Sequence, residues 1–114
     1  MFGRRRIIDV TPEEAAGRHE RGAVLLDVRE DDEWAAGHAP RAVHVPLAQV
    51  DEAAARFGGR SVLTVCRSGK RSADAARRLA EAGVEVRNVA GGMSCWAGAG
   101  LAVVCDDGSP GVVA

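Results

Sequence analysis

Ser61-Val62-Leu63-Thr64-Val65-Cys66-Arg67-Ser68-Gly69-Lys70-Arg71-Ser72 joins a strand-like apolar run to a loop that holds one cysteine, three cations and a glycine. The segment that follows, 73–81, places small apolar side chains on one face of a helix and charged side chains on the other. We therefore predict a strand over 61–65, a loop that begins at Cys66, and an amphipathic helix that stops near Gly83.

The composition of this loop predicts an activated cysteine. The thiolate is the nucleophilic form, and Arg67, Lys70, Arg71 and the positive end of the following helix would all stabilise it. Such surroundings lower a cysteine pKa from ~8.5 to roughly 3.5–7.5. Successive backbone N–H groups would also form a concave site for an anion. The alternative, an inert core thiol, fits the charged neighbours poorly, so covalent group transfer is favoured.

Outward from the loop, apolar runs of strand length alternate with helical patterns. Further strands are predicted over 7–10, 23–28, 43–45 and 84–89, and further helices over 11–22, 31–37, 47–57 and 93–97. The continuous apolar run 23–28 is typical of a strand that is buried on both faces. The alternation predicts an α/β fold with a mainly parallel central sheet of about five strands and helices on both faces. Ligands bind beyond the carboxyl ends of such strands, which is where Cys66 falls.

The length of 114 residues suits one domain. We divide the chain into a basic N-terminal segment with the first strand (1–10), the main domain (11–102) and a weakly specified C-terminal tail (103–114). Fifteen basic and sixteen acidic residues give a formal charge of −1, so neither nucleic acid nor a membrane is an expected partner, and Arg4 to Arg6 are interpreted as a solvated tail. Without a signal peptide or an apolar span, a cytoplasmic location is expected.

The three cysteines, Cys66, Cys95 and Cys105, are odd in number and form no Cys-x-x-Cys pair. This pattern argues against a disulfide framework and against a zinc site. We therefore expect reduced thiols, no metal and no cofactor.

Several motifs together resemble a single-domain rhodanese, a sulfurtransferase that carries sulfane sulfur as a cysteine persulfide. They occur in the order Leu26-Asp27-Val28-Arg29, Glu33-Trp34, Gly37-His38-Ala39-Pro40, Val45-Pro46-Leu47, Cys66 to Ser72, and Gly91-Gly92-Met93 with Trp96. The resemblance covers the chain from Thr11 to Ala102 and implies the rhodanese-like α/β domain.

The resemblance also implies roles for the loop. Cys66 would form the persulfide, and Arg71 would close the loop. The cradle around the sulfur would comprise five residues, Arg67, Ser68, Gly69, Lys70 and Arg71. Four residues separate Cys66 from Arg71, as in rhodaneses, whereas related cysteine phosphatases have five. The spacing therefore favours sulfur over a phosphoryl group, with Arg67 and Lys70 as candidates to contact the donor anion.

The implied reaction is a double displacement. The Cys66 thiolate takes the outer sulfur of a donor such as thiosulfate and passes it to cyanide, glutathione or a protein thiol, and a thioredoxin-like or sulfur-carrier protein is a candidate partner. Two alternatives stay open. One is a sulfur relay, sensing or binding module without turnover. The other is a cysteine phosphatase or arsenate reductase on the same scaffold.

Other polar residues are given structural roles. We interpret Asp27, Arg29 and Glu33 as members of internal ion pairs that fix loops, and we do not expect His38 or His44 to act as a base for Cys66.

Cys95 departs from the small residue usual before the family's tryptophan. It is either a packed thiol, which is favoured, or a persulfide acceptor or disulfide partner of Cys66. Cys105 lies where the resemblance has ended.

Overall fold

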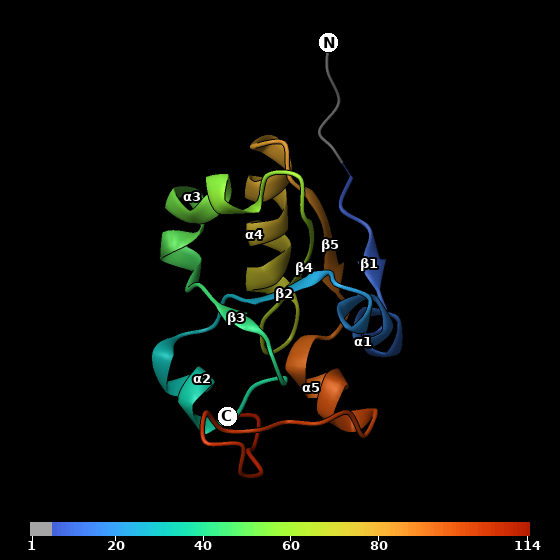
Figure 1. Ribbon diagram of the computed structural model, residues 1–114, viewed down its shortest axis with the longest axis vertical. Coiled ribbons are helices and arrows are strands. Elements are labelled where there is room, and N and C mark those ends of the chain that lie inside the picture. The colour runs from blue at the N-terminus through green and yellow to red at the C-terminus, as the bar shows by residue number, and fades with distance from the viewer. Residues whose placement is uncertain (1–5) are drawn as a thin grey trace.

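Five strands form one sheet in the computed structural model, which describes residues 6–114 (Figure 1). In spatial order they are β1 (Asp9–Val10), β5 (Glu85–Val89), β4 (Ser61–Val65), β2 (Val24–Asp27) and β3 (Val43–His44). Every neighbouring pair is parallel. The predicted α/β fold with a five-stranded parallel sheet is confirmed, although β1 is shorter than the predicted run 7–10.

Helices cover both faces of this sheet. They are α1 (Pro12–Glu20), α2 (Asp31–Ala36), α3 (Val50–Ala53), α4 (Lys70–Glu81) and α5 (Gly92–Gly98). Figure 1 shows α3 and α4 on one face and α1 and α5 on the other. Within residues 6–114, no helix is long and apolar enough to cross a membrane.

The predicted helix over 47–57 is only partly α-helical. The short α3 is flanked by two 3₁₀ segments, Leu47–Gln49 and Ala54–Phe57. Val50 and Ala53 of α3 and Phe57 of the second 3₁₀ segment are buried, three and four residues apart. The apolar stripe therefore faces the sheet through a mixture of the two helix types.

The side chains of the central strands alternate between two separate cores. Leu26 of β2 and Val62 of β4 pack with α3 and α4, whereas Leu25 and Leu63, one residue along each strand, pack with α1 and α5. All four side chains are fully buried. A strand covered on both faces needs no polar position, which explains the continuous apolar runs in the sequence.

The C-terminal segment 103–114 packs against the domain. Val104 pairs with His38 in two backbone hydrogen bonds of 2.8 Å, and the Val112 N–H donates to the Ala36 carbonyl at 3.0 Å. A Cβ on Gly37 would lie 2.5 Å from the carbonyl oxygen of Val112, so glycine is required for this approach. The segment is thus more ordered than its composition indicates, while the division at residue 102 stays a prediction.

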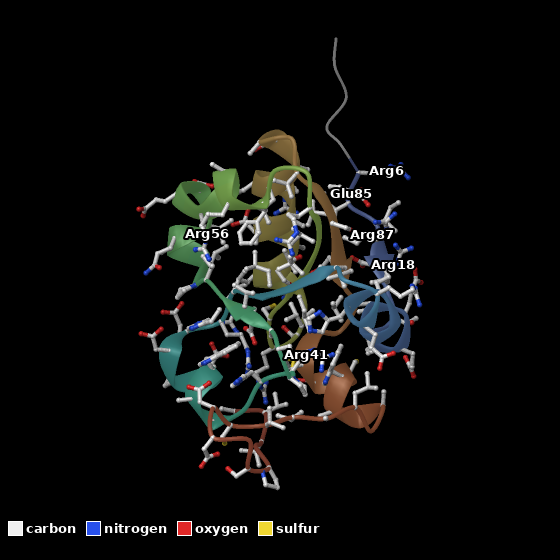
Figure 2. The ribbon with its side chains drawn as sticks, viewed as in Figure 1. Arg6, Arg18, Arg41, Arg56, Glu85 and Arg87 are labelled. Carbon is white, nitrogen blue, oxygen red and sulfur yellow. The ribbon has the colours of Figure 1, made fainter. Side chains whose placement is uncertain are left out.

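The predicted basic segment at the N-terminus lies largely outside the described residues. Arg4 and Arg5 belong to the undescribed part, and Arg6, labelled in Figure 2, is exposed.

Candidate active site

Cys66 lies at the carboxyl end of β4, where the chain leaves the centre of the sheet and turns into α4. The residue is 1% exposed. Gly69 precedes the helix with a φ of 110°, a left-handed conformation that residues with a side chain rarely adopt. The sharp turn at Gly69 brings the start of α4 back over the sulfur.

Hydrogen-bond donors of the loop and of α4 surround the Cys66 sulfur. The Gly69 N–H lies 3.1 Å from Sγ, and the Ser72 hydroxyl lies 3.3 Å from it. Burial alone would raise the pKa of the thiol, but hydrogen bonds from the Ser72 side chain and from the backbone of Ser72, Gly69 and Ser68 outweigh it, so the pKa lies below its ordinary value. The direction agrees with the sequence prediction. The main cause does not, because hydrogen bonds rather than the three cations dominate.

The start of α5 supports the loop from behind. The Met93 N–H donates to the Cys66 carbonyl at 2.7 Å, and the Ser94 N–H donates to the Arg67 carbonyl at 3.0 Å. A Cβ on Gly92 would lie 2.3 Å from the Cys66 carbonyl oxygen. Gly92 therefore permits a contact between the two segments that any side chain would obstruct.

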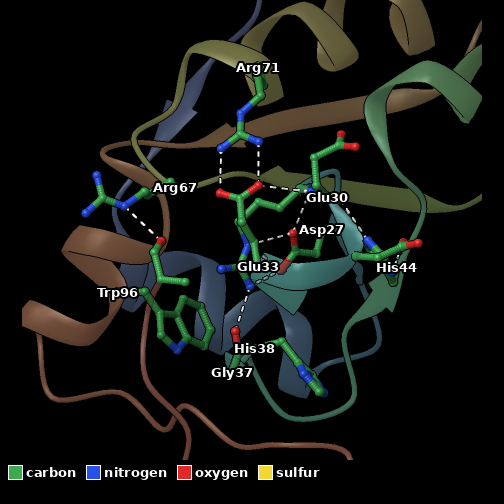
Figure 3. Close-up of polar contacts among 12 residues, drawn as sticks. Asp27, Glu30, Glu33, Gly37, His38, His44, Arg67, Arg71 and Trp96 are labelled. Carbon is green, nitrogen blue, oxygen red and sulfur yellow. Dashed lines mark hydrogen bonds and ion pairs between the residues drawn. The ribbon is translucent and has the colours of Figure 1, made fainter. Parts of the chain in front are cut away.

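Arg71 is held by an acidic residue from a distant part of the chain. Its guanidinium donates to both carboxylate oxygens of Glu33 at 2.7 and 2.9 Å (Figure 3). The Arg71 hydrogen bonds are the largest cause that lowers the pKa of Glu33 to about 2, and the same pair raises the pKa of Arg71. The predicted loop-closing arginine thus anchors the loop to α2.

The remaining cradle residues face solvent to different extents. Arg67, Ser68 and Lys70 are exposed, and Gly69 is half-buried. The Arg67 Nε donates to the Ala114 carbonyl oxygen at 2.9 Å, which ties the C-terminal segment to the loop (Figure 3). Contact of Arg67 and Lys70 with a donor anion stays a prediction.

A buried ion pair fixes the neighbouring strand end. The Arg29 Nη2 lies 2.8 Å from Asp27 Oδ2 and also donates to the Gly37 carbonyl at 2.8 Å, and the side chains of Asp27 and Arg29 are fully buried. Together with the Glu33–Arg71 pair, this confirms that the three charged residues near β2 form internal ion pairs.

The two candidate histidines bind groups away from the sulfur. His38 Nε2 lies 3.2 Å from Asp106 Oδ1, and His44 Nε2 lies 2.8 Å from the Arg29 carbonyl. Both rings stack on Trp34. Among residues 6–114, neither histidine has a hydrogen bond to Cys66, which agrees with the structural role that we expected.

Cys66, Cys95 and Cys105 are not joined by disulfides in the structure. Cys95 is exposed on α5, with its sulfur against Gly91. The Cys105 thiol lies 3.6 Å from the Ala36 carbonyl oxygen.

Sequence reasoning missed the role of Ser72 and the partner of Arg71. Ser72 continues the buried stripe of α4 that includes Ala76 and Leu79. A hydroxyl on the apolar face of a helix, six residues after a candidate nucleophile, is a signal that would have found it. The pairing of Arg71 with Glu33 joins residues 38 positions apart, and nothing in their local sequence marks it.

The sequence matches the model of a known protein family. The model of the rhodanese-like domain matches residues 11–99. The chain belongs to the rhodanese-like domain family. The family includes sulfurtransferases as well as members without catalytic activity.

Relatives of this rhodanese-like chain differ in size and description. The candidate sulfurtransferase YtwF of Bacillus subtilis is 40% identical over 75 residues, which cover 65% of this chain and 73% of YtwF. The HTH-type transcriptional regulator Rv0324 of Mycobacterium tuberculosis is 39% identical over 105 residues, which cover 89% of this chain and 46% of Rv0324. The chain therefore spans less than half the length of that regulator.

A solved structure shows the same fold. The rhodanese-like domain protein of Staphylococcus aureus has a TM-score of 0.73 and 29% identity, and the match covers 79% of this chain and 91% of that protein.

Proposed function

We propose that this rhodanese-like domain is a sulfurtransferase that moves sulfane sulfur through a persulfide on Cys66. The observation that carries the proposal is the buried Cys66 sulfur, which accepts hydrogen bonds from the Gly69 N–H and the Ser72 hydroxyl. These hydrogen bonds lower the pKa of the thiol, which favours the thiolate without a histidine base. The description of YtwF as a candidate sulfurtransferase supports the same activity.

The reaction proceeds in two displacements. The Cys66 thiolate attacks the outer sulfur of thiosulfate, the sulfur–sulfur bond of the donor breaks, and its electron pair leaves with sulfite. The outer sulfur stays on Cys66 as a persulfide anion. An acceptor thiolate or cyanide then attacks that sulfur, and Cys66 leaves as a thiolate. A lowered thiol pKa helps twice, because the thiolate is the attacking group in the first step and the leaving group in the second.

The donors around the sulfur serve both stages. Backbone N–H groups and the Ser72 hydroxyl stabilise negative charge on the sulfur that they contact. Arg67 and Lys70 are exposed beside the loop, where they would attract an anionic donor. The acceptor is proposed to be a small thiol, cyanide or the thiol of a partner protein.

Intact mass measurement tests the persulfide directly. The protein is incubated with thiosulfate, excess donor is removed, and the intact mass is measured by mass spectrometry. We expect the mass to increase by one sulfur atom. The adduct should vanish in Cys66→Ser and persist in the matched control Cys95→Ser, which removes an exposed thiol instead. No adduct, or an adduct that survives Cys66→Ser, would contradict the proposal. Thiocyanate formation from thiosulfate and cyanide then measures turnover.

A second candidate is a sulfur-sensing or relay module without turnover. The match to Rv0324 favours this function, because that relative is described as a transcriptional regulator and the matched segment covers only 46% of it. A stable persulfide with very slow transfer to cyanide and glutathione would support this function over turnover. Phosphatase or arsenate reductase activity stays a less favoured alternative, and hydrolysis of an aryl phosphate that is lost in Cys66→Ser would support the phosphatase.

A further inference from the structure

Four polar side chains connect the edge of the sheet with the cysteine loop. They belong to β1, β5, β4 and α4, and they are Asp9, Asn88, Thr64 and Ser72. Thr64 and Ser72 are fully buried and Asn88 is 3% exposed, whereas Asp9 reaches solvent. Polar side chains at such positions in a parallel sheet require hydrogen-bond partners, since an unpaired buried polar group is costly.

Asn88 has one possible orientation of its amide. Its Nδ2 lies 3.1 Å from Asp9 Oδ1 and 3.4 Å from the Gly69 carbonyl oxygen. A carboxylate oxygen and a backbone carbonyl oxygen only accept hydrogen bonds, so the amide nitrogen must face them. The Asn88 Oδ1 then faces the Thr64 hydroxyl at 3.3 Å, which also lies 2.9 Å from the Ser72 carbonyl. The single Thr64 proton lies nearer the Ser72 carbonyl, so the orientation of the amide is fixed by the two acceptors on its nitrogen side.

The Ser72 hydroxyl has a single proton but two acceptors at equal distance. Its Oγ lies 3.3 Å from Cys66 Sγ and 3.3 Å from the Gly69 carbonyl oxygen. Only one of these hydrogen bonds forms at a time. The position of this proton therefore decides whether Ser72 stabilises the sulfur.

The Gly69 carbonyl is already occupied by other donors. It accepts from the Ala73 N–H at 3.1 Å and from the Asn88 amide at 3.4 Å. A carbonyl oxygen has two lone pairs, and these two donors fill them. Without the Asn88 amide, the Ser72 proton would have a free acceptor in competition with the sulfur.

We propose that Asn88 is a positioning residue for Cys66: by donating to the Gly69 carbonyl it leaves the Ser72 proton for the sulfur, and Asp9 holds its amide in place. The effect is largest when the sulfur is charged, because hydrogen bonds to ionised acceptors are the stronger ones. The inference rests on the proposed function only in that the Cys66 thiolate is taken as the reacting group.

Alkylation of Cys66 by iodoacetamide tests the proposal without any sulfur transfer. The rate is followed from pH 5 to 10 by mass spectrometry of the Cys66 peptide, so Cys95 and Cys105 do not interfere. The variants are Asn88→Leu, which has similar volume and no donor, Ser72→Ala, and the double variant. Arg67, Lys70 and Arg71 stay unchanged in all of them, so the cations around the loop are constant.

We expect Asn88→Leu to raise the midpoint of the rate profile by about one pH unit, which means about tenfold less thiolate below the midpoint. Ser72→Ala should raise it at least as much, and the double variant should resemble Ser72→Ala alone. An unchanged midpoint in folded Asn88→Leu would overturn the proposal. So would an equal further shift in the Ser72→Ala background, because Asn88 would then act independently of Ser72.

If Asn88→Leu does not fold, the Asp9→Ala variant tests the proposal instead. Asp9 is exposed, so we expect this variant to fold. Loss of a negative charge by itself lowers a thiol pKa, whereas release of the Asn88 amide raises it. A raised midpoint would support the proposal, and an unchanged or lowered one would overturn it. The thiosulfate mass adduct is recorded separately, so failure of the persulfide and failure of the Asn88 role are distinguishable.

Discussion

Replacing Glu33 with glutamine removes the charge that holds the arginine of the cysteine loop. The Glu33 carboxylate accepts two hydrogen bonds from Arg71 at 2.7 and 2.9 Å. It also accepts one from the backbone N–H of Glu30 at 3.0 Å. We expect the Glu33→Gln variant to fold with lower stability near neutral pH, because glutamine keeps the size of the side chain but not its charge.

The expected loss follows from the pKa of Glu33. Its fall from 4.5 to about 2 would correspond to about 3.4 kcal/mol if the pair were fully shielded from water. The side chains of Arg71 and Glu33 are 35% and 16% exposed, so solvent screening reduces this to about 1–2 kcal/mol. Because folding lowers the pKa, the stabilisation is fully present above pH ~4.5 and is lost as the pH falls through about 2.

Urea denaturation of both proteins at pH 7, 5 and 3 measures this difference. The gap in free energy of unfolding should be nearly equal at pH 7 and 5 and clearly smaller at pH 3. Glu85→Gln is the matched control, since Glu85 pairs with Arg87 on the surface (Figure 2) and its loss should have little effect at any of these pH values. A gap that is absent at pH 7, or that stays constant down to pH 3, would refute the reasoning.

Two further substitutions test how the neighbourhood of Cys66 is built. Asp27→Ala leaves the fully buried Arg29 without its partner, and we expect a loss of about 3–5 kcal/mol in urea denaturation; an unchanged unfolding midpoint would contradict the role of this ion pair. Gly92→Ala places a Cβ 2.3 Å from the Cys66 carbonyl oxygen, so both thermal stability and the alkylation rate of Cys66 should fall. Gly98→Ala in the same helix meets no atom within 4 Å and should leave both unchanged, and equal effects of the two variants would argue against the close contact.

Local patterns in the sequence were sufficient to predict the order of strands and helices. The apolar run 23–28 contains β2, whose four residues are all buried, and the strand over 61–65 was predicted with its observed bounds. Hydrophobic periodicity depends only on residues close together along the chain, so it can be recognised from the sequence alone. The helix over 47–57 was less accurate because the choice between α and 3₁₀ turns depends on packing against the sheet.

The sequence by itself also located the candidate nucleophile, since Cys66 directly follows a buried strand and precedes a glycine turn. It did not determine what stabilises the sulfur. Three cations close in sequence suggested charge, whereas in the structure the turn at Gly69 directs a backbone N–H and the Ser72 hydroxyl to the sulfur. Backbone geometry, and not the proximity of charges along the chain, decides which groups reach an atom.

Only the tertiary structure brought together the residues that fix the loop. Arg71 finds Glu33 across 38 positions, and the Asn88 amide reaches both Asp9, 79 positions away, and the loop. Such pairings depend on how parallel strands and their connections are placed side by side, which is set by the packing of the whole domain. The sequence therefore determined the elements and the reactive residue, and the tertiary structure decided its partners, because hydrogen bonds form only between groups that the fold brings within about 3 Å.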